Sequence, residues 1–204
     1  MNRRTILVQL SAHAPFTALG AASGILLMIV LNRIEVPRPV SETLFWTLHP
    51  LHVLVSALVT TAMYRLHEKG GWAKTLLIGY LGSVGIATLS DSLIPYAGEW
   101  LLGLPNRGLH LGFIEKAWLV NPLALGGIAL AFAWPRTRFP HAFHMFLSTW
   151  ASLFHMQMAL GTSPGIGQLA AIAVFLFLAV WIPCCTSDIV FPLLWVKGRR
   201  KDRK

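Results

Sequence analysis

Charged side chains are scarce in this sequence. Asp, Glu, Lys and Arg together make up 12% of its 204 residues, against about 25% in an ordinary soluble domain. Hydrophobic residues make up 55%, and the mean hydropathy is +0.61. About six spans of about 20 residues would use nearly the whole chain, which excludes a separate soluble domain. We therefore expect an all-α, polytopic membrane helix bundle over residues 1–196 and a basic cytoplasmic tail over residues 197–204.

Cysteine is scarcer still, and its placement argues against a redox function. The two cysteines, Cys184 and Cys185, are adjacent. Adjacent cysteines rarely bond to each other because the disulfide would be strained. The sequence has no Cys-x-x-Cys pair, so a thiol oxidoreductase is not expected. It also shows no internal repeat strong enough to predict a duplicated fold.

Long hydrophobic segments are present instead, and they predict about six transmembrane helices, because lipid cannot satisfy an open backbone. The segments cover residues 10–31, 43–65, 72–95, 118–134, 139–161 and 166–194. The stretch between the third and fourth segments, residues 96–117, is too short and too interrupted to cross the bilayer twice. Its Trp100, Phe113 and Glu115 favour a helix or loop that lies at the membrane interface.

Basic residues give the bundle an orientation. With the N-terminus in the cytoplasm, all but four of the 17 Lys and Arg residues fall on the cytoplasmic side. The four exceptions are Arg33, Arg38, Arg107 and Lys116. This bias predicts that both termini are cytoplasmic in a bacterial or archaeal cytoplasmic (inner) membrane. It also accounts for the net charge of +9 without nucleic acid. The expected partner is the lipid bilayer, and a second copy of the chain or another membrane subunit stays open.

The fifth segment carries the most unusual pattern, a polar stripe inside a predicted span. His144 and His155 are separated by about three helical turns and share a face, and Ser148 and Ser152 lie close to it. His141 lies at the start of the same segment. Polar side chains in hydrocarbon are unfavourable unless they face a partner, a cavity or an ion. The stripe therefore predicts a functional interior.

One group of possible ligands falls in the outer half of the bundle. His49 and His52 lie on one face of the second segment, at a spacing of three residues. Asp91 lies one turn before Pro95 in the third segment, and His155 lies near the outer end of the fifth. Their depths differ by less than about 8 Å at 1.5 Å per residue. We expect His49, His52, Asp91 and His155 to form one metal site.

A second group falls in the cytoplasmic half. Cys184 and Asp188 are four residues apart and share a face of the sixth segment. They lie at a depth similar to that of three histidines from the first and fifth segments. The possible inner metal site consists of His13, His141, His144, Cys184 and Asp188.

Histidine, carboxylate and thiolate are ligands for borderline transition metals, Zn²⁺ first among them. Two ligand groups at opposite depths predict a small transporter for a divalent metal ion, or a proton-coupled carrier. Two alternatives stay open, and with them the question of whether the protein is an enzyme. One is a zinc-dependent intramembrane hydrolase for a lipid-like substrate, with Asp91 or Glu115 as base. The other is a haem b electron carrier, with His52 and His155 as axial ligands.

Overall fold

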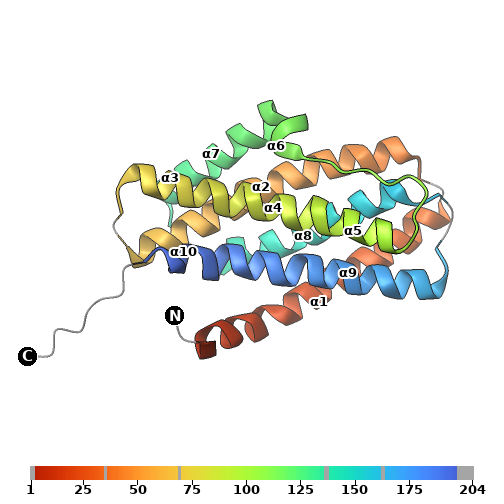
Figure 1. The fold of residues 1–204 in the computed structure, drawn as a ribbon, viewed down its shortest axis with the longest axis horizontal. Coiled ribbons are helices and arrows are strands. Elements are labelled where there is room, and N and C mark those ends of the chain that lie inside the picture. Colours follow the sequence, from red (N-terminus) through yellow and green to blue (C-terminus); the bar gives the residue numbers. More distant parts are fainter. Residues whose placement is uncertain (1–2, 35, 69, 136–137, 162–163, 197–204) are drawn as a thin grey trace, which may run out of the picture.

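The computed structural model describes residues 3–34, 36–68, 70–135, 138–161 and 164–196, and every regular element in these ranges is helical (Figure 1). The expected tail, residues 197–204, lies outside them. The first half contains α1 (Arg3–Arg33), α2 (Arg38–His67), α3 (Trp72–Tyr80), η1 (Leu81–Gly85), α4 (Ile86–Thr88), η2 (Leu89–Leu93) and α5 (Ile94–Leu101). The second half contains α6 (Gly112–Glu115), α7 (Ala117–Ala133), α8 (Arg138–Ala159), α9 (Ile166–Cys185), η3 (Thr186–Val190) and α10 (Phe191–Leu194).

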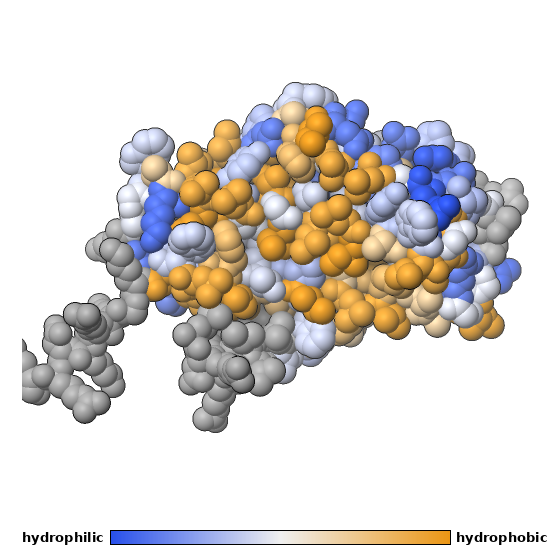
Figure 2. All heavy atoms as spheres, viewed as in Figure 1, coloured by the Kyte–Doolittle hydropathy of each residue, from blue (hydrophilic) through white to orange (hydrophobic). Residues whose placement is uncertain are grey.

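Three helical runs are long and apolar enough to cross a membrane, which confirms an all-α fold with candidate membrane spans. They are Arg38–His67, Trp72–Leu101 and Ile166–Leu194. Two shorter apolar helices cover Thr17–Leu31 and Ala117–Ala133. Figure 2 shows hydrophobic side chains over most of the middle of one face, while hydrophilic ones gather toward its edges. An apolar exterior of this kind is what a lipid-facing surface requires.

Helix α8 is less apolar because it lies inside the bundle. It packs against α1, α2, α5 and α9, and most of its described side chains are buried. A helix enclosed by other helices does not need an apolar surface all round, so its histidines and serines can face partners in the protein. The polar stripe predicted for the fifth segment is thus directed into the bundle, as expected.

The third span does not end at Pro95, and this part of the prediction is wrong. The chain remains helical from Trp72 to Leu101, and Pro95 lies just after the π-helical turn η2. A proline normally clashes with the carbonyl four residues earlier. A π-turn widens the helix locally and gives that ring room. Pro192 follows η3 at the same offset, and Asp91 and Asp188 are each the third residue of their π-turn.

These matching π-turns belong to an internal repeat of a few spaced residues, which becomes evident when the two halves of the structure are compared. The α2 pattern His-x-x-His-x-x-x-Ser-x-x-x-Thr recurs in α8 as His-x-x-His-x-x-x-Ser-x-x-x-Ser. The pattern Ser-Asp-x-x-x-Pro occurs once after each of these helices, at Ser90 and at Ser187. In Figure 1, α2 and α8 run in opposite directions, and so do the α3–α5 run and the α9–α10 run. The two halves are therefore related as an inverted repeat, with a pseudo-two-fold axis between α2 and α8.

The first helix of each half packs on the other half's pair. Helix α1 contacts α8 and α9, while α7 contacts α2 and α3. Gly20 of α1 approaches Thr149 so closely that an added Cβ would lie 2.8 Å from the Thr149 hydroxyl oxygen. Gly127 of α7 approaches Leu54 and Ala57 in the same way. Ala57 and Thr149 hold the same position in the repeated pattern, so both halves use one small residue for one close helix contact.

Candidate metal centre

The first cluster joins two histidines of α2 to the carboxylate of η2. Nδ1 of His49 lies 2.9 Å from Oδ2 of Asp91, and Nδ1 of His52 lies 2.6 Å from the same oxygen. The other oxygen, Oδ1, accepts hydrogen bonds from Ser90 at 2.7 Å and from Ser148 at 2.9 Å. All five side chains are buried. Asp91 is thus held by donors on every side and cannot rotate freely.

The second cluster repeats this arrangement in the other half. Nδ1 of His141 lies 2.6 Å from Oδ2 of Asp188, and Nδ1 of His144 lies 2.9 Å from it. Thr60 of α2 donates to Oδ1 of Asp188 at 3.4 Å. Ser187, beside Asp188, lies 3.2 Å from the Thr60 hydroxyl. Asp188 and His144 have no exposed surface, and His141 is nearly buried.

Each cluster has a hydroxyl donor from the helix that supplies the histidines of the other cluster. Asp91 takes its histidines from α2 and the Ser148 hydroxyl from α8, whereas Asp188 takes its histidines from α8 and the Thr60 hydroxyl from α2. Each cluster therefore needs both halves of the inverted repeat. A relative movement of α2 and α8 would alter both clusters together.

The ring nitrogens that do not face a carboxylate are the groups suited to hold a metal. Nε2 of His49, His52, His144 and His155 is buried and has no hydrogen-bond partner among the residues that the structure describes. A buried polar atom without a partner is unfavourable. We assign the proton to Nδ1 where that atom faces a carboxylate, which leaves a lone pair on Nε2. Metal-bound histidines usually donate their second ring N–H to such a carboxylate, which orients the ring.

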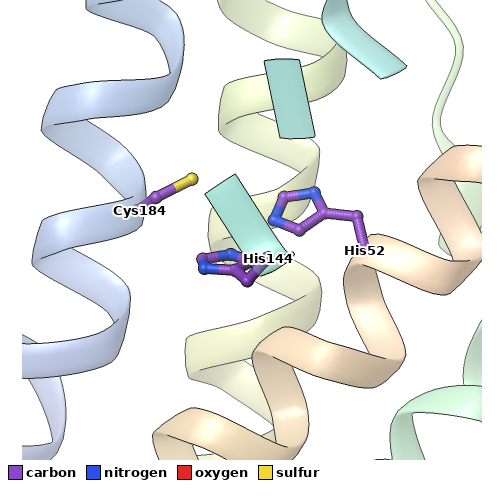
Figure 3. A group of neighbouring side chains, drawn as sticks. All are labelled: His52, His144 and Cys184. Carbon is purple, nitrogen blue, oxygen red and sulfur yellow. The ribbon is translucent and has the colours of Figure 1, made fainter. Parts of the chain in front are cut away.

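A third group lies between the two clusters. The rings of His52 and His144 are 4.5 Å apart between centroids and tilted by 30°. Cys184 of α9 directs its sulfur toward these two imidazoles, as Figure 3 shows. Ligand atoms of His52, His144 and Cys184 all lie within 4.8 Å of one another, as they do in the groups His49, His52, Asp91 and His141, His144, Asp188. The Cys184 thiol donates to the Ser148 hydroxyl at 3.4 Å.

The structure brings together only part of each predicted site. His155 was expected beside Asp91, but its Nδ1 lies 2.7 Å from Glu99, whose other oxygen accepts from the Gly108 backbone at 3.1 Å. Cys184 was expected with His141 and Asp188, yet it groups with His52 and His144. His13 lies in α1, and its side chain is outside the described part of the structure.

Glu99 is a buried residue that the sequence reasoning missed. It falls just after Pro95, in the stretch predicted to lie at the membrane interface, whereas the structure pairs it with His155 inside the bundle. The available signal was a carboxylate directly before Trp100 in an otherwise apolar run. The hydroxyl groups of Ser90 and Thr60 were also overlooked as carboxylate partners. Their signal was the repeated pattern described above.

Comparison with models of protein families, with curated proteins and with solved structures finds no match for this chain. The fold and the site therefore define the protein by class. It is an all-α protein with three helical runs that could cross a membrane and with buried His, Asp and Cys groups that could hold a metal ion.

Proposed function

We propose that this protein carries a divalent transition-metal ion across a membrane, and that the ion passes between the His49/His52/Asp91 cluster and the His141/His144/Asp188 cluster. One observation carries the proposal: the two clusters meet at the contact between the His52 and His144 rings, whose centroids are 4.5 Å apart. A path for an ion needs ligands at successive depths that are close enough for transfer. The line of imidazoles supplies them.

The proposed topology has six spans: α1, α2, the α3–α5 run, α7, α8 and the α9–α10 run. The bias of basic residues supports a cytoplasmic location for both termini. His49 lies one turn nearer the start of α2 than His52, and His141 lies one turn nearer the start of α8 than His144. Because these helices are antiparallel, the Asp91 cluster faces the outer side and the Asp188 cluster faces the cytoplasm. This is the arrangement that lets an inverted repeat open alternately to each side.

Charge balance supports a cation as the cargo. Asp91 and Asp188 are both fully buried, and two uncompensated carboxylates inside a membrane bundle would be strongly unfavourable. One divalent ion neutralises both. Two protons taken up by the paired histidines would do the same, so metal and protons are expected to exchange. This argument connects the metal carrier with the proton-coupled carrier.

The two other functions find less support in the geometry. A haem b site would need the rings of His52 and His155 on the two faces of one porphyrin. Instead His52 packs on His144, and His155 packs on Phe45 at 5.3 Å between centroids. For a hydrolase, the possible base Glu115 is exposed and already accepts from His110 and from the Leu111 backbone. A visible absorption spectrum of the purified protein tests the haem alternative directly.

The test of the transport function is Zn²⁺ uptake into proteoliposomes that contain the full chain and an internal zinc indicator. Asp91→Asn keeps the size of the side chain and removes the charge that holds His49 and His52. We expect it to lower the uptake rate by about tenfold or more, in line with the loss of a residue that orients metal ligands. His110→Ala, at a partly exposed histidine that belongs to none of the three groups, is the matched control and should change uptake little.

Equal damage by the two substitutions would assign the 102–111 loop to the site and favour the enzyme. Wild-type liposomes that move protons but no Zn²⁺ would show a proton carrier, and the metal cargo would be wrong.

A further inference from the structure

We propose that His52, His144 and Cys184 form a third metal site at the centre of the bundle, and that this site selects a thiolate-binding divalent ion such as Zn²⁺ or Cd²⁺. The inference rests on the proposed transport function and deepens it, because it names the class of ion. Neither histidine cluster contains a sulfur ligand, so the central group has its own chemistry.

The two imidazoles of this site face each other across the contact between α2 and α8. His52 and His144 hold the same position in the repeated pattern of α2 and α8. Each turns Nδ1 toward its own carboxylate, Asp91 or Asp188, and each has a buried Nε2 without a hydrogen-bond partner in the described part of the chain. An ion bound by these two nitrogens would touch both halves at once. It would also be adjacent to both clusters, because each histidine belongs to one of them.

Cys184 breaks the symmetry at this point. It lies four residues before Asp188, and the residue four before Asp91 is Ala87. The repeat therefore accepts a plain methyl group in one half at the position where the other half has a thiol. Packing alone does not explain the sulfur, since it lies within 4.8 Å of ligand atoms of both His52 and His144. The repeated pattern supplies the two histidine nitrogens, and Cys184, which has no equivalent in the other half, adds the sulfur.

The donor set decides which ions fit. Two imidazoles and one thiolate favour Zn²⁺ and other soft or borderline ions, whereas Mg²⁺, Ca²⁺ and Mn²⁺ prefer oxygen. A tetrahedral zinc ion holds its ligand atoms roughly 3.3–3.7 Å apart, given its bond lengths to nitrogen and sulfur. The ligand atoms of this group all lie within 4.8 Å of one another, so side-chain rotations can bring them to these separations. The fourth position is left for water or for the Ser148 hydroxyl, which already contacts Cys184.

Binding at the centre also has a proton balance. The thiol must lose its proton when the metal–sulfur bond forms, and that proton leaves to solvent. The complex then combines a divalent cation with one thiolate, beside the two aspartates. Relative to an ion in either histidine cluster, the central complex carries one more negative charge. The additional negative charge stabilises the cation at the centre, between the two histidine clusters.

The experiment is a Cd²⁺ titration of the purified full chain in detergent under reducing conditions, followed by ultraviolet absorption. A thiolate bound to Cd²⁺ gives a charge-transfer band that imidazole and carboxylate do not give. We expect the wild type to develop this band with one equivalent of ion, and Cys184→Ala to lose it. Cys185→Ala is the matched control, because Cys185 is also buried and belongs to none of the three groups. It should retain the band, and excess Mn²⁺ should not displace it.

A wild-type protein that binds Cd²⁺ without the band would overturn the third site, and so would a band that survives Cys184→Ala. If Cys184→Ala fails to fold, as judged by its thermal unfolding, Cys184→Ser replaces it and must also lose the band. Zinc uptake in liposomes separates this inference from the transport function. Zinc uptake without a thiolate band would support the transport function and rule out the third site. A thiolate band without zinc uptake would support the third site and rule out the transport function.

Discussion

His52 and His144 pack their imidazole rings together at the centre of the bundle, 4.5 Å apart between centroids, although they come from different halves of the chain. They hold the same position in the repeated pattern, and each is tied to a different aspartate. This contact places the two carboxylate clusters in one continuous polar interior. It explains why the polar residues of α2 and α8 face each other rather than lipid.

The hydroxyl of Ser148 should contribute measurably to stability. It donates to Asp91 at 2.9 Å and accepts from Cys184 at 3.4 Å, with no exposed surface. Ser148→Ala leaves a buried carboxylate with one donor fewer, so we expect a loss of about 1–3 kcal/mol in the free energy of unfolding. Chemical unfolding in detergent micelles measures it.

The control for this experiment is Ser41→Ala. Ser41 is equally buried, but its hydroxyl oxygen has no hydrogen-bond partner among the described residues. Ser41→Ala should lower the free energy of unfolding by less than about 0.5 kcal/mol. Similar losses for the two variants would mean that the Ser148 contact to Asp91 does not hold the cluster together.

The close approach of α7 and α2 predicts a sharp difference between adjacent glycines. An added Cβ at Gly127 would collide with the backbone carbonyl of Leu54, while one at Gly126 meets nothing within 4 Å. Gly127→Ala should therefore destabilise the protein by about 1–3 kcal/mol through overpacking. Gly126→Ala should be neutral or stabilising by up to about 1 kcal/mol, because alanine favours a helix. Thermal unfolding of the two variants tests this prediction, and equal unfolding midpoints would contradict the close contact between α2 and α7.

The helical class and the helix faces of most polar residues were predictable, because both depend on local sequence. Hydropathy over about 20 residues identifies a span, and a spacing of three or four residues places His49 and His52 on one face. The partner of Asp91 in the neighbouring helix also followed from its depth. These predictions needed only the rise per residue of an α-helix.

The groupings were harder to predict because they depend on how helices rotate about their axes. Depth alone placed His155 with Asp91, but the π-turn at Asp91 and the continued helix beyond Pro95 bring Glu99 to His155 instead. Cys184 lies at the depth of the inner cluster, yet its face of α9 points to His52 and His144. Widened turns shift the register of every later residue, and no periodicity in the sequence marks them.

Metal binding should weaken as the solution is made more acidic. A histidine must be neutral to offer its lone pair to a metal, so protons and metal compete for the same nitrogens. We therefore expect Zn²⁺ affinity to fall as the pH is lowered. Isothermal titration in buffers of different ionisation enthalpy counts the protons released for each ion bound. A count of zero, with affinity independent of pH, would contradict histidine ligands.

The inverted repeat makes the last prediction directional. The Asp91 and Asp188 clusters are built alike, but antiparallel helices place them toward opposite sides of the proposed membrane. Asp91→Asn should therefore raise the apparent KM for Zn²⁺ supplied from the outer side, and Asp188→Asn should raise it for Zn²⁺ supplied from the cytoplasmic side. Each variant should leave the apparent KM on the opposite side within about twofold of the wild type, because that cluster keeps both histidines and its carboxylate. Counterflow in liposomes of known protein orientation measures both sides. If both substitutions acted on the same side, the two clusters could not be the two ends of one path, and the six-span topology would have to be revised.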